Sequence, residues 1–312
     1  MLALIGLLLV LVAVLGGFLL EKGNLFVLMQ PAEIFIIVGA ATGIVLVANP
    51  WTVIRKMLAG VIATLRRPPP NRDTYLRHLQ MLYEILVYAQ RSGGVVSLEH
   101  DVEEPADSAI FSSYSALLRD RAACDFLCDS LRMLVIGATS PEELDGLMEL
   151  DIEAQRRGRL EPVNALNSVA DSLPGLGIVA AVLGVVITME AIGGAADSVG
   201  QKVAAALVGT FLGILLCYGV VGPLAARLEN LGEAQGQLLQ VMRIALLSFA
   251  RGSAPILAIE YARRSIDTEL RPSFVDMEAC IKRDARIPSV PKPGQSGQPP
   301  PAEEADAPTA ET

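Results

Sequence analysis

The sequence is poor in the residues that carry out catalysis or hold a metal ion. Its 312 residues include only two histidines, four cysteines and one tryptophan. It has no glycine-rich phosphate-binding loop, no HExxH motif and no nucleophile elbow. Glu99, His100 and Asp101 could in principle bind a metal, but adjacent residues of one short segment converge poorly on an ion, which favours a solvated charged loop. Nothing in the sequence supports an enzyme or a bound cofactor.

Charged residues are missing from four long stretches. Residues 1–20 carry none, and runs of 21, 18 and 24 uncharged residues lie at 34–54, 172–189 and 203–226. About 20 apolar residues cross the hydrocarbon core of a bilayer, so we predict four transmembrane helices. The first run could instead be a signal peptide, but no basic residue precedes it and no small-x-small cleavage site follows it. We therefore interpret it as a retained anchor.

The basic residues predict the orientation of these spans. The segments after span two, before span three and after span four are rich in Arg and Lys, whereas the other two loops hold one lysine each. Because positive residues stay on the cytoplasmic side, we expect a multi-pass membrane protein with both termini and the long middle segment in the cytoplasm. The net charge of −9 does not contradict this orientation, because the acids collect in the cytoplasmic domain and tail. No basic patch interleaved with aromatic residues suggests nucleic acid binding. The cysteines, which lack CxxC spacing, are expected to be reduced structural thiols.

No alternating β-pattern occurs, so the predicted fold is an all-α membrane protein with a helical cytoplasmic domain. Transmembrane helices one and two occupy residues 1–54, and helices three and four occupy 169–226. Residues 55–168 form the cytoplasmic helical domain, and 227–286 form C-terminal cytoplasmic helices. The tail at 287–312 is rich in Pro, Gly, Gln and acidic residues and is predicted to be disordered. Within the cytoplasmic parts, helices are expected at 51–67, 73–92, 110–118, 122–136, 140–158, 224–249 and 256–266.

Spans three and four each carry a stripe of small residues at helical spacing. Such stripes let helix backbones approach closely in a membrane, and ordinary helix packing is enough to explain the pattern. Pro174 is predicted to lie in the first turn of span three, capped by Ser172. Pro223 is expected near the end of span four, where a lost backbone bond can be absorbed locally. Because the connecting loop is short, both prolines are expected near the same membrane face. The stripes are Gly177-Ala181-Gly184-Thr188 and Ala206-Gly209/Thr210-Gly213-Cys217.

Six motifs are distributed along the chain. They are DSLPGLGIVAA at 171–181, VGTFLGILL at 208–216, GPL at 222–224, QPAE at 30–33, SLE at 97–99 with Asp101, and RPSF at 271–274. Together these motifs resemble the MotA family of ion-conducting stator subunits of the bacterial flagellar motor. The resemblance covers about residues 1 to 280. Gly175, where other members often carry Ala, is a minor departure.

The resemblance implies a homo-oligomeric ring, reported as pentameric, around a dimer of MotB, a single-span partner anchored to peptidoglycan. Ions would pass between the ring and an aspartate of the partner helix, and the cytoplasmic domain would push on the rotor protein FliG. Carried over by motif, Pro174 and Pro223 are associated with ion-coupled motion, and the Thr210 hydroxyl faces the ion path.

The same resemblance implies that Arg91 and Glu99 face the rotor, in a protein involved in flagellar motility and chemotaxis. Without the family, these two residues would be interpreted as ordinary charges at a helix end and a helix start. Sodium-driven relatives carry a further hydroxyl at the position of Ala181, so the methyl group there predicts proton drive.

The interiors of the predicted spans contain no Asp, Glu, Lys, Arg or His, so a conducting protein would need a carboxylate from a partner helix packed on the two stripes. An energiser of the ExbB or TolQ type would use similar helices, but such proteins have fewer spans. A secondary transporter would need polar or ionisable ligands at the bilayer midplane. A membrane scaffold would leave the two prolines unexplained.

Overall fold

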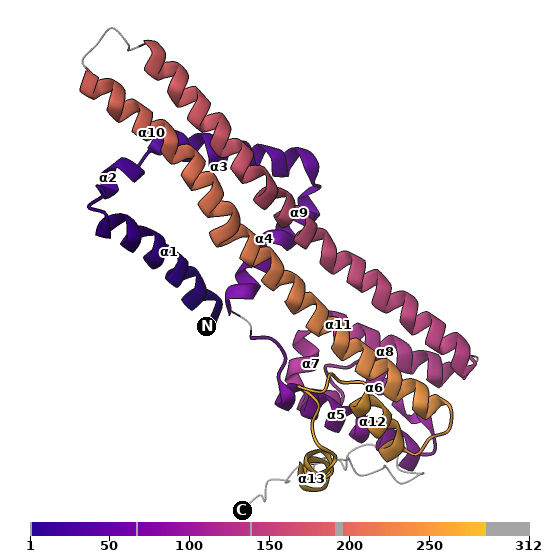
Figure 1. The fold of residues 1–312 in the computed structure, drawn as a ribbon. Coiled ribbons are helices and arrows are strands. Elements are labelled where there is room, and N and C mark those ends of the chain that lie inside the picture. The colour runs from indigo at the N-terminus through magenta and orange to yellow at the C-terminus, as the bar shows by residue number, and fades with distance from the viewer. Residues whose placement is uncertain (1, 67, 138, 191–195, 285–312) are drawn as a thin grey trace, which may run out of the picture. The chain divides into compact units, whose positions relative to one another are not determined.

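The computed structural model describes residues 2–66, 68–137, 139–190 and 196–284, and this part of the chain contains helices and no strand. It divides into two compact units (Figure 1). The first unit comprises residues 1–75, 145–243 and 264–271, and the second comprises 76–144, 244–263 and 272–312. The helical fold class is therefore confirmed. The predicted tail at 287–312 lies outside the described residues.

The first unit contains the apolar helices. Among the described residues, four helices are long and apolar enough to span a membrane, as the charge-free runs predict. The last two form a long antiparallel hairpin (Figure 1). The elements are α1 (Leu2–Leu20), α2 (Leu25–Leu28), α3 (Pro31–Ala48), α4 (Trp51–Arg66), α9 (Pro141–Glu190), α10 (Ala196–Ile214), the π-helix η3 (Leu215–Val221) and α11 (Gly222–Ala250).

Helix α3 packs on the hairpin through one face. Pro31 occupies the first helical turn, where its missing N–H costs nothing. The buried residues then follow at intervals of four, so they form a single stripe: Glu33, Ile37, Ala41 and Val45. Ile37 and Ala41 share an apolar cluster with Ala170, Leu173, Ala180 and Cys217 of the hairpin. This stripe fixes α3 against α9 and α10.

The prediction that a new helix starts near Pro174 is wrong. Helix α9 runs unbroken from Pro141 to Glu190, with Pro162 and Pro174 in its interior. Its start is at Ser140, whose hydroxyl accepts from the Glu143 N–H at 3.2 Å while the Glu143 carboxylate accepts from the Ser140 N–H at 2.9 Å. Ser172 caps nothing, because its hydroxyl donates to the Val169 carbonyl at 2.8 Å. A backbone in hydrocarbon has no partner outside the helix, so it stays helical through a proline.

The π-helix η3 ends where Pro223 enters the chain. Pro223 has no N–H to donate, and the preceding turn widens so that the Gly222 N–H bonds to the Cys217 carbonyl. The backbone is therefore rearranged next to the proline, as a π-turn at an interruption of the helical ladder. It occurs at the junction of the apolar span and the polar part of α11.

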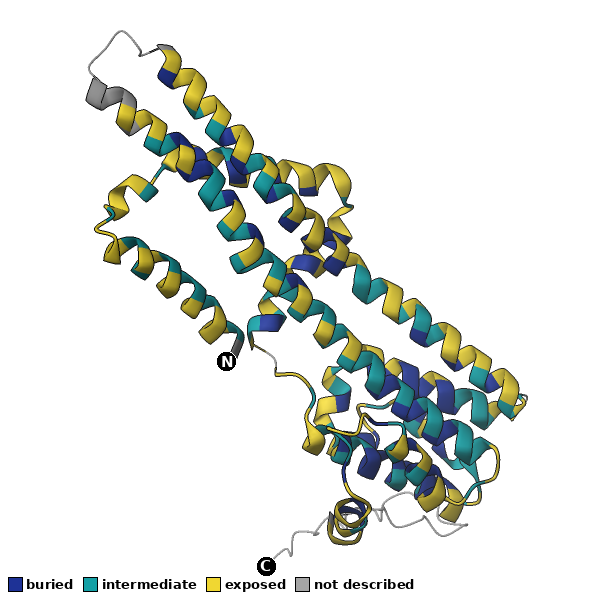
Figure 2. Cartoon of the chain, viewed as in Figure 1, coloured by how far each residue is buried: buried dark blue, intermediate teal, exposed yellow. Residues whose placement is uncertain are grey.

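The second unit is built on α5 (Arg72–Arg91) and α8 (Arg121–Ile136), which confirm two of the predicted helices. The predicted helix at 110–118 is broken, because Tyr114 has a non-helical backbone (φ −114°, ψ 61°). Nine fully buried apolar side chains form the core, which Figure 2 shows in dark blue: Leu79, Leu82, Ile85, Leu86, Leu98, Phe111, Phe126, Leu127 and Leu131. The remaining elements are η1 (Val95–Leu98), α6 (Glu99–Glu103), η2 (Phe111–Ser113), α7 (Ser115–Arg119), α12 (Pro255–Arg264) and α13 (Phe274–Asp284).

Candidate functional site

The small-residue stripes of α9 and α10 pack against each other. A Cβ atom added to Gly177 would lie 2.7 Å from the Gly209 carbonyl oxygen and 3.1 Å from the Gly213 Cα. One added to Gly213 would lie 2.5 Å from the Leu173 carbonyl oxygen, and one added to Gly184 would lie 2.8 Å from the Ala206 Cβ. The glycines therefore allow direct contact between the two backbones, as small residues do in membrane helix pairs.

This contact corrects one part of the sequence interpretation. A partner helix was expected to pack on both complete stripes, but the second helix of the same chain already covers Gly177, Gly184 and Gly213. The pattern alone could not decide this, because close packing within a chain and between chains needs the same small residues. This packing leaves only the edges of the two stripes partly exposed among the described residues.

Thr210 and Ala181 lie at those edges. Both are half-buried, whereas their neighbours Gly209 and Ala180 are fully covered. A Cβ atom added to Gly177 would lie 3.3 Å from the Cα atom of Thr210, so Thr210 belongs to the contact between the helices. The hydroxyl predicted for the ion path therefore projects from a residue at the margin of the glycine contact.

The two prolines are not at the same depth. The Leu173 carbonyl, next to Pro174, is level with Gly213, and Pro223 comes ten residues after Gly213. At 1.5 Å per residue, Pro223 lies about 10–15 Å further along the hairpin. The two prolines therefore lie at different heights along the hairpin.

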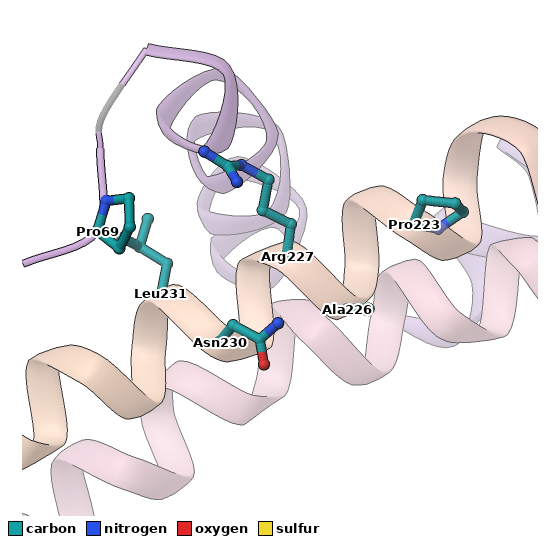
Figure 3. A pocket seen from close by; sticks show the side chains of 6 residues that line it. All are labelled: Pro69, Pro223, Ala226, Arg227, Asn230 and Leu231. Atoms are coloured by element: carbon teal, nitrogen blue, oxygen red, sulfur yellow. The ribbon is translucent and has the colours of Figure 1, made fainter. Parts of the chain in front are cut away.

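Pro223 lines an open pocket of about 470 Å³ (Figure 3). The other lining residues are Pro69, Ala226, Arg227, Asn230 and Leu231. The Arg227 Nε donates a hydrogen bond to the Thr64 carbonyl at 2.9 Å, at the end of α4. Pro223 is exposed beside this bond, so the junction of span four with α11 has free space next to it.

Glu33 is the residue that the sequence interpretation missed. It comes directly before the uncharged run at 34–54, yet it lies in the first turn of α3 and is only 7% exposed. A Cβ on Gly209 would overlap its Oε2 atom, and one on Gly184 would lie 3.3 Å from its Oε1 atom. Its Oε2 atom has no hydrogen-bond partner. The described spans therefore do contain a titratable interior residue.

Two signals in the sequence could have identified this position. Pro31 favours a helix that starts before Glu33, and Glu33 continues the four-residue spacing of the buried α3 stripe. Both place the carboxyl group on the face that packs against the hairpin.

The outward faces of the hairpin are apolar and exposed. They include Ile178, Val179, Val182, Leu183 and Val186 of α9, each about half exposed (Figure 2). A soluble protein rarely leaves so many large apolar residues on one helix uncovered. In a bilayer, such faces contact lipid or other membrane helices.

Arg91 and Glu99 lie close in sequence in the second unit, and both are exposed. Arg91 ends α5, and Gly93 and Gly94, with φ of +91° and +120°, turn the chain towards η1 and α6. Because Leu98 is fully buried in the core, the start of α6 is fixed at the surface. The two charged residues therefore sit on an anchored turn.

Two polar residues of the sequence motifs, Asp101 and Arg271, have structural partners. Asp101 accepts a hydrogen bond from the Ser108 hydroxyl at 2.6 Å, and Ser108 in turn accepts from the N–H groups of Ile110 and Phe111 at 3.2 Å. In the first unit, Arg271 of the RPSF motif donates to the carbonyls of Ile266 and Arg264 at 2.9 Å. Among the described residues, no group of three potential ligands is placed to hold a metal ion.

Ion pairs connect α9 to its neighbours on the polar side of the first unit. Arg243 of α11 lies 2.6 Å from Asp145 and 3.2 Å from Glu149, and Lys56 of α4 lies 3.2 Å from Glu161. Arg243 is 17% exposed, so its pair is better shielded from water than the Lys56 pair. These contacts hold α4 and α11 against the polar half of α9.

Two family models match the chain. The model for the N-terminal part of motility protein A matches residues 4–93. The model for the MotA/TolQ/ExbB proton channel family matches residues 119–241, which include the α9–α10 hairpin.

Curated relatives and solved structures agree with these models. Motility protein A of Escherichia coli is 39% identical over 282 residues, which cover 90% of this chain and 95% of the relative. Chemotaxis protein LafT of Vibrio parahaemolyticus is 37% identical over 277 residues, or 89% and 97% of the two chains. The flagellar MotAB stator complex of Bacillus subtilis matches with 27% identity and a TM-score of 0.67 over 82% of this chain and 92% of the matched one. The C. jejuni MotAB structure shares the fold at 19% identity, with a TM-score of 0.72 over 87% and 98% of the two chains. The chain belongs to the motility protein A family.

Proposed function

We propose that this chain is an ion-conducting stator subunit of the bacterial flagellar motor, which couples proton flow to torque on the rotor. The observation that carries the proposal is the match with motility protein A at 39% identity over 95% of that relative. The fold supports it, because four candidate membrane helices and a helical polar unit reproduce the architecture of a solved MotAB stator complex. The protein resides in the inner membrane.

The stator role requires a partner of the MotB type, a single-span protein that is anchored to peptidoglycan and supplies the ion-binding aspartate. The hairpin offers that partner a specific surface, namely the edges of the stripe contact at Ala181 and Thr210, flanked by exposed apolar side chains. We place the partner helix along these edges. Copies of the chain would form a ring, taken as a pentamer, around a partner dimer and in contact with lipid.

Pro174 and Pro223 are assigned to ion-coupled motion of the hairpin. Pro174 removes one backbone bond from the middle of α9, and Pro223 follows the widened turn of η3. Helices bend at prolines and π-turns because the regular ladder of backbone bonds is interrupted there. The open pocket beside Pro223 leaves room for α11 to shift at this junction.

The polar parts are assigned to the cytoplasm, where the exposed Arg91 and Glu99 would meet charges on the rotor protein FliG. The excess of Arg and Lys after span two, before span three and after span four supports this orientation. Residues 55–168 and 227–286 are then cytoplasmic helices, and residues 1–54 and 169–226 carry the spans.

The experiment that tests the proposal is deletion of the gene. A stator subunit transmits force but is not needed to build the filament, so the mutant cells should carry flagella that do not rotate. Expression of the chain from a plasmid should restore rotation. A deletion strain that swims normally, or one that lacks flagella, would contradict the stator assignment.

A further inference from the structure

Glu33 is a buried carboxyl group that the contacts of the fold do not explain. It is 7% exposed, and its Oε2 atom has no hydrogen-bond partner. The other buried members of its stripe, Ile37, Ala41 and Val45, are apolar. A glutamate at this position destabilises the fold relative to an aliphatic residue. Burial removes water from the carboxyl group, and no hydrogen-bond partner of Oε2 compensates for that loss.

The usual structural use of an acid near a helix start is absent here. An acid in the third helical position can accept from the N–H of the capping residue. The capping residue Gln30 makes no such bond, because its N–H donates to the Leu28 carbonyl at 3.1 Å. The carboxyl group points away from the cap and towards the backbones of α9 and α10.

The glycine contact leaves space for this carboxyl group. Gly209 has no side chain where Oε2 lies, and Gly184 has none near Oε1. Gly184 is six residues before the end of α9 at Glu190, so Glu33 lies about 9 Å inside that end of the hairpin. One turn nearer the end, the buried Thr188 hydroxyl donates to the Gly184 carbonyl at 2.7 Å. The next residue after Gly209 is Thr210, at the edge proposed for the partner helix.

Among the described side chains, none forms an ion pair with Glu33. The charged residues described on the neighbouring spans are Asp171 on α9 and Lys202 on α10, and both are exposed. Glu21 and Lys22, in the loop that precedes α2, are exposed as well. Arg55 and Lys56 of α4 follow the opposite end of α3.

We propose that Glu33 is a second proton-binding group of the ion path, located on the non-cytoplasmic side of the partner's aspartate. Its carboxylate accepts a proton from water on that side and becomes a neutral acid. The acid then passes the proton towards the partner's carboxylate and returns to its ionised form. Only O–H bonds form and break, and no redox reagent is needed. This inference rests on the proposed stator function and adds a residue of this chain to its proton path.

The test uses the full-length chain with its partner in cells that lack their own stator subunits. Glu33→Gln keeps the shape of the side chain but cannot carry a proton, and Glu33→Asp keeps the acid. Glu21→Gln is the matched control, because it removes an exposed acid from the loop that precedes α2. Rotation speed is measured at low load, where proton transfer limits the motor, and at high load, where the driving force limits it, over a range of external pH.

We expect Glu33→Gln to lower the low-load speed by about a hundredfold, at the lower end of what a proton-transferring group contributes. Its high-load torque and its amount in the membrane should change less than about twofold, as for a replacement of similar volume. The remaining speed should also lose part of its dependence on external pH. Glu33→Asp should recover part of the speed, and Glu21→Gln should behave as the unmodified chain.

Infrared spectra of the purified complex give a readout that does not depend on rotation. The difference spectrum between low and high pH should contain a neutral carboxylic acid band in the unmodified chain and in Glu21→Gln that is missing in Glu33→Gln, while the bands of the other carboxyl groups, including the partner's aspartate, remain. Normal speed and pH dependence in Glu33→Gln would overturn the proposal, as would loss of membrane assembly in both Glu33→Gln and Glu33→Asp. Failure of the unmodified chain to drive rotation would instead overturn the stator function.

Discussion

Replacing Gly177 with alanine tests the direct contact between α9 and α10. The new Cβ would lie 2.7 Å from the Gly209 carbonyl oxygen and 3.1 Å from the Gly213 Cα. Both are backbone atoms, which cannot rotate away, so the two helices would have to separate by roughly half an ångström. A gap of that size forfeits about a quarter or more of the dispersion energy along the contact.

Overpacking of this kind typically costs about 1–3 kcal/mol. The matched control is Gly175→Ala, two residues away on the same helix, where an added Cβ meets no atom within 4 Å. Both replacements gain the helix preference of alanine over glycine, about 0.5–1 kcal/mol. The difference between the two variants therefore isolates the cost of the overlap.

The measurement is the thermal unfolding midpoint of each variant, purified with its partner in the same detergent. At about 2–4 °C per kcal/mol, Gly177→Ala should unfold several degrees below Gly175→Ala. Gly175→Ala should match or exceed the unmodified chain. Equal midpoints for the two variants would show that α9 and α10 do not pack through this stripe, and the structural account of the hairpin would be wrong.

Three further predictions concern the rotor contact, a buried thiol and the orientation. Arg91→Glu should change the free energy of unfolding by at most about 1 kcal/mol, because the side chain is exposed. It should nevertheless reduce swimming, and a matching charge reversal on the rotor should partly restore it. Normal swimming of Arg91→Glu under load would contradict the rotor contact. Burial raises the pKa of the Cys128 thiol from 9.0 to about 12, so its contribution to stability is complete below pH 9 and is lost between pH 9 and pH 12. Above pH 9, the free energy of unfolding of Cys128→Ala should therefore fall less steeply with pH than that of the unmodified chain, by up to about 1.4 kcal/mol per pH unit. The free energies are measured by denaturant titration at each pH, and the same dependence on pH in both proteins would refute the buried thiol. A cysteine at the exposed position of Glu21 should react with an impermeant thiol reagent outside intact cells, and one at the exposed Glu104 should not; the reverse pattern would overturn the orientation.

Hydropathy and helical periodicity predicted the parts of the fold that depend on local composition. The four charge-free runs correspond to the four candidate spans, and α5 and α8 begin and end within one residue of their predicted limits. The capping motif at Ser140 correctly marked the start of α9. These features depend on residues that are neighbours in sequence, so a single sequence contains the information.

The errors concern contacts between distant segments. Pro174 has the local features of a helix start, but the helix that arrives from Pro141 simply continues through it. Glu33 is charged and stands at the end of an apolar run, which suggests that it is exposed. It is buried because Gly209 has no side chain where its carboxyl group lies. The glycine stripes of α9 and α10 cover each other, although either could have received a partner helix. In each case the structure depends on contacts between segments that are far apart in the sequence, and local sequence patterns do not identify these contacts.

The roles of the site residues depend on the family more than on geometry. The structure puts Thr210 and Ala181 at the edges of the hairpin contact and exposes Arg91 and Glu99 on a fixed turn. Neither position shows by itself which molecule it meets. The ion-path and rotor assignments of these four residues stay predictions that partner complexes and variants must test.

The central claim is that proton flow through this chain and its partner drives rotation. The most direct measurement is motor speed in cells whose only stator subunits are this chain and its partner, at fixed membrane potential, with external pH and sodium varied independently. The account predicts that speed follows external pH and does not respond to sodium, because Ala181 supplies no oxygen ligand beside Thr210. A speed that collapses when sodium is withdrawn would contradict proton coupling.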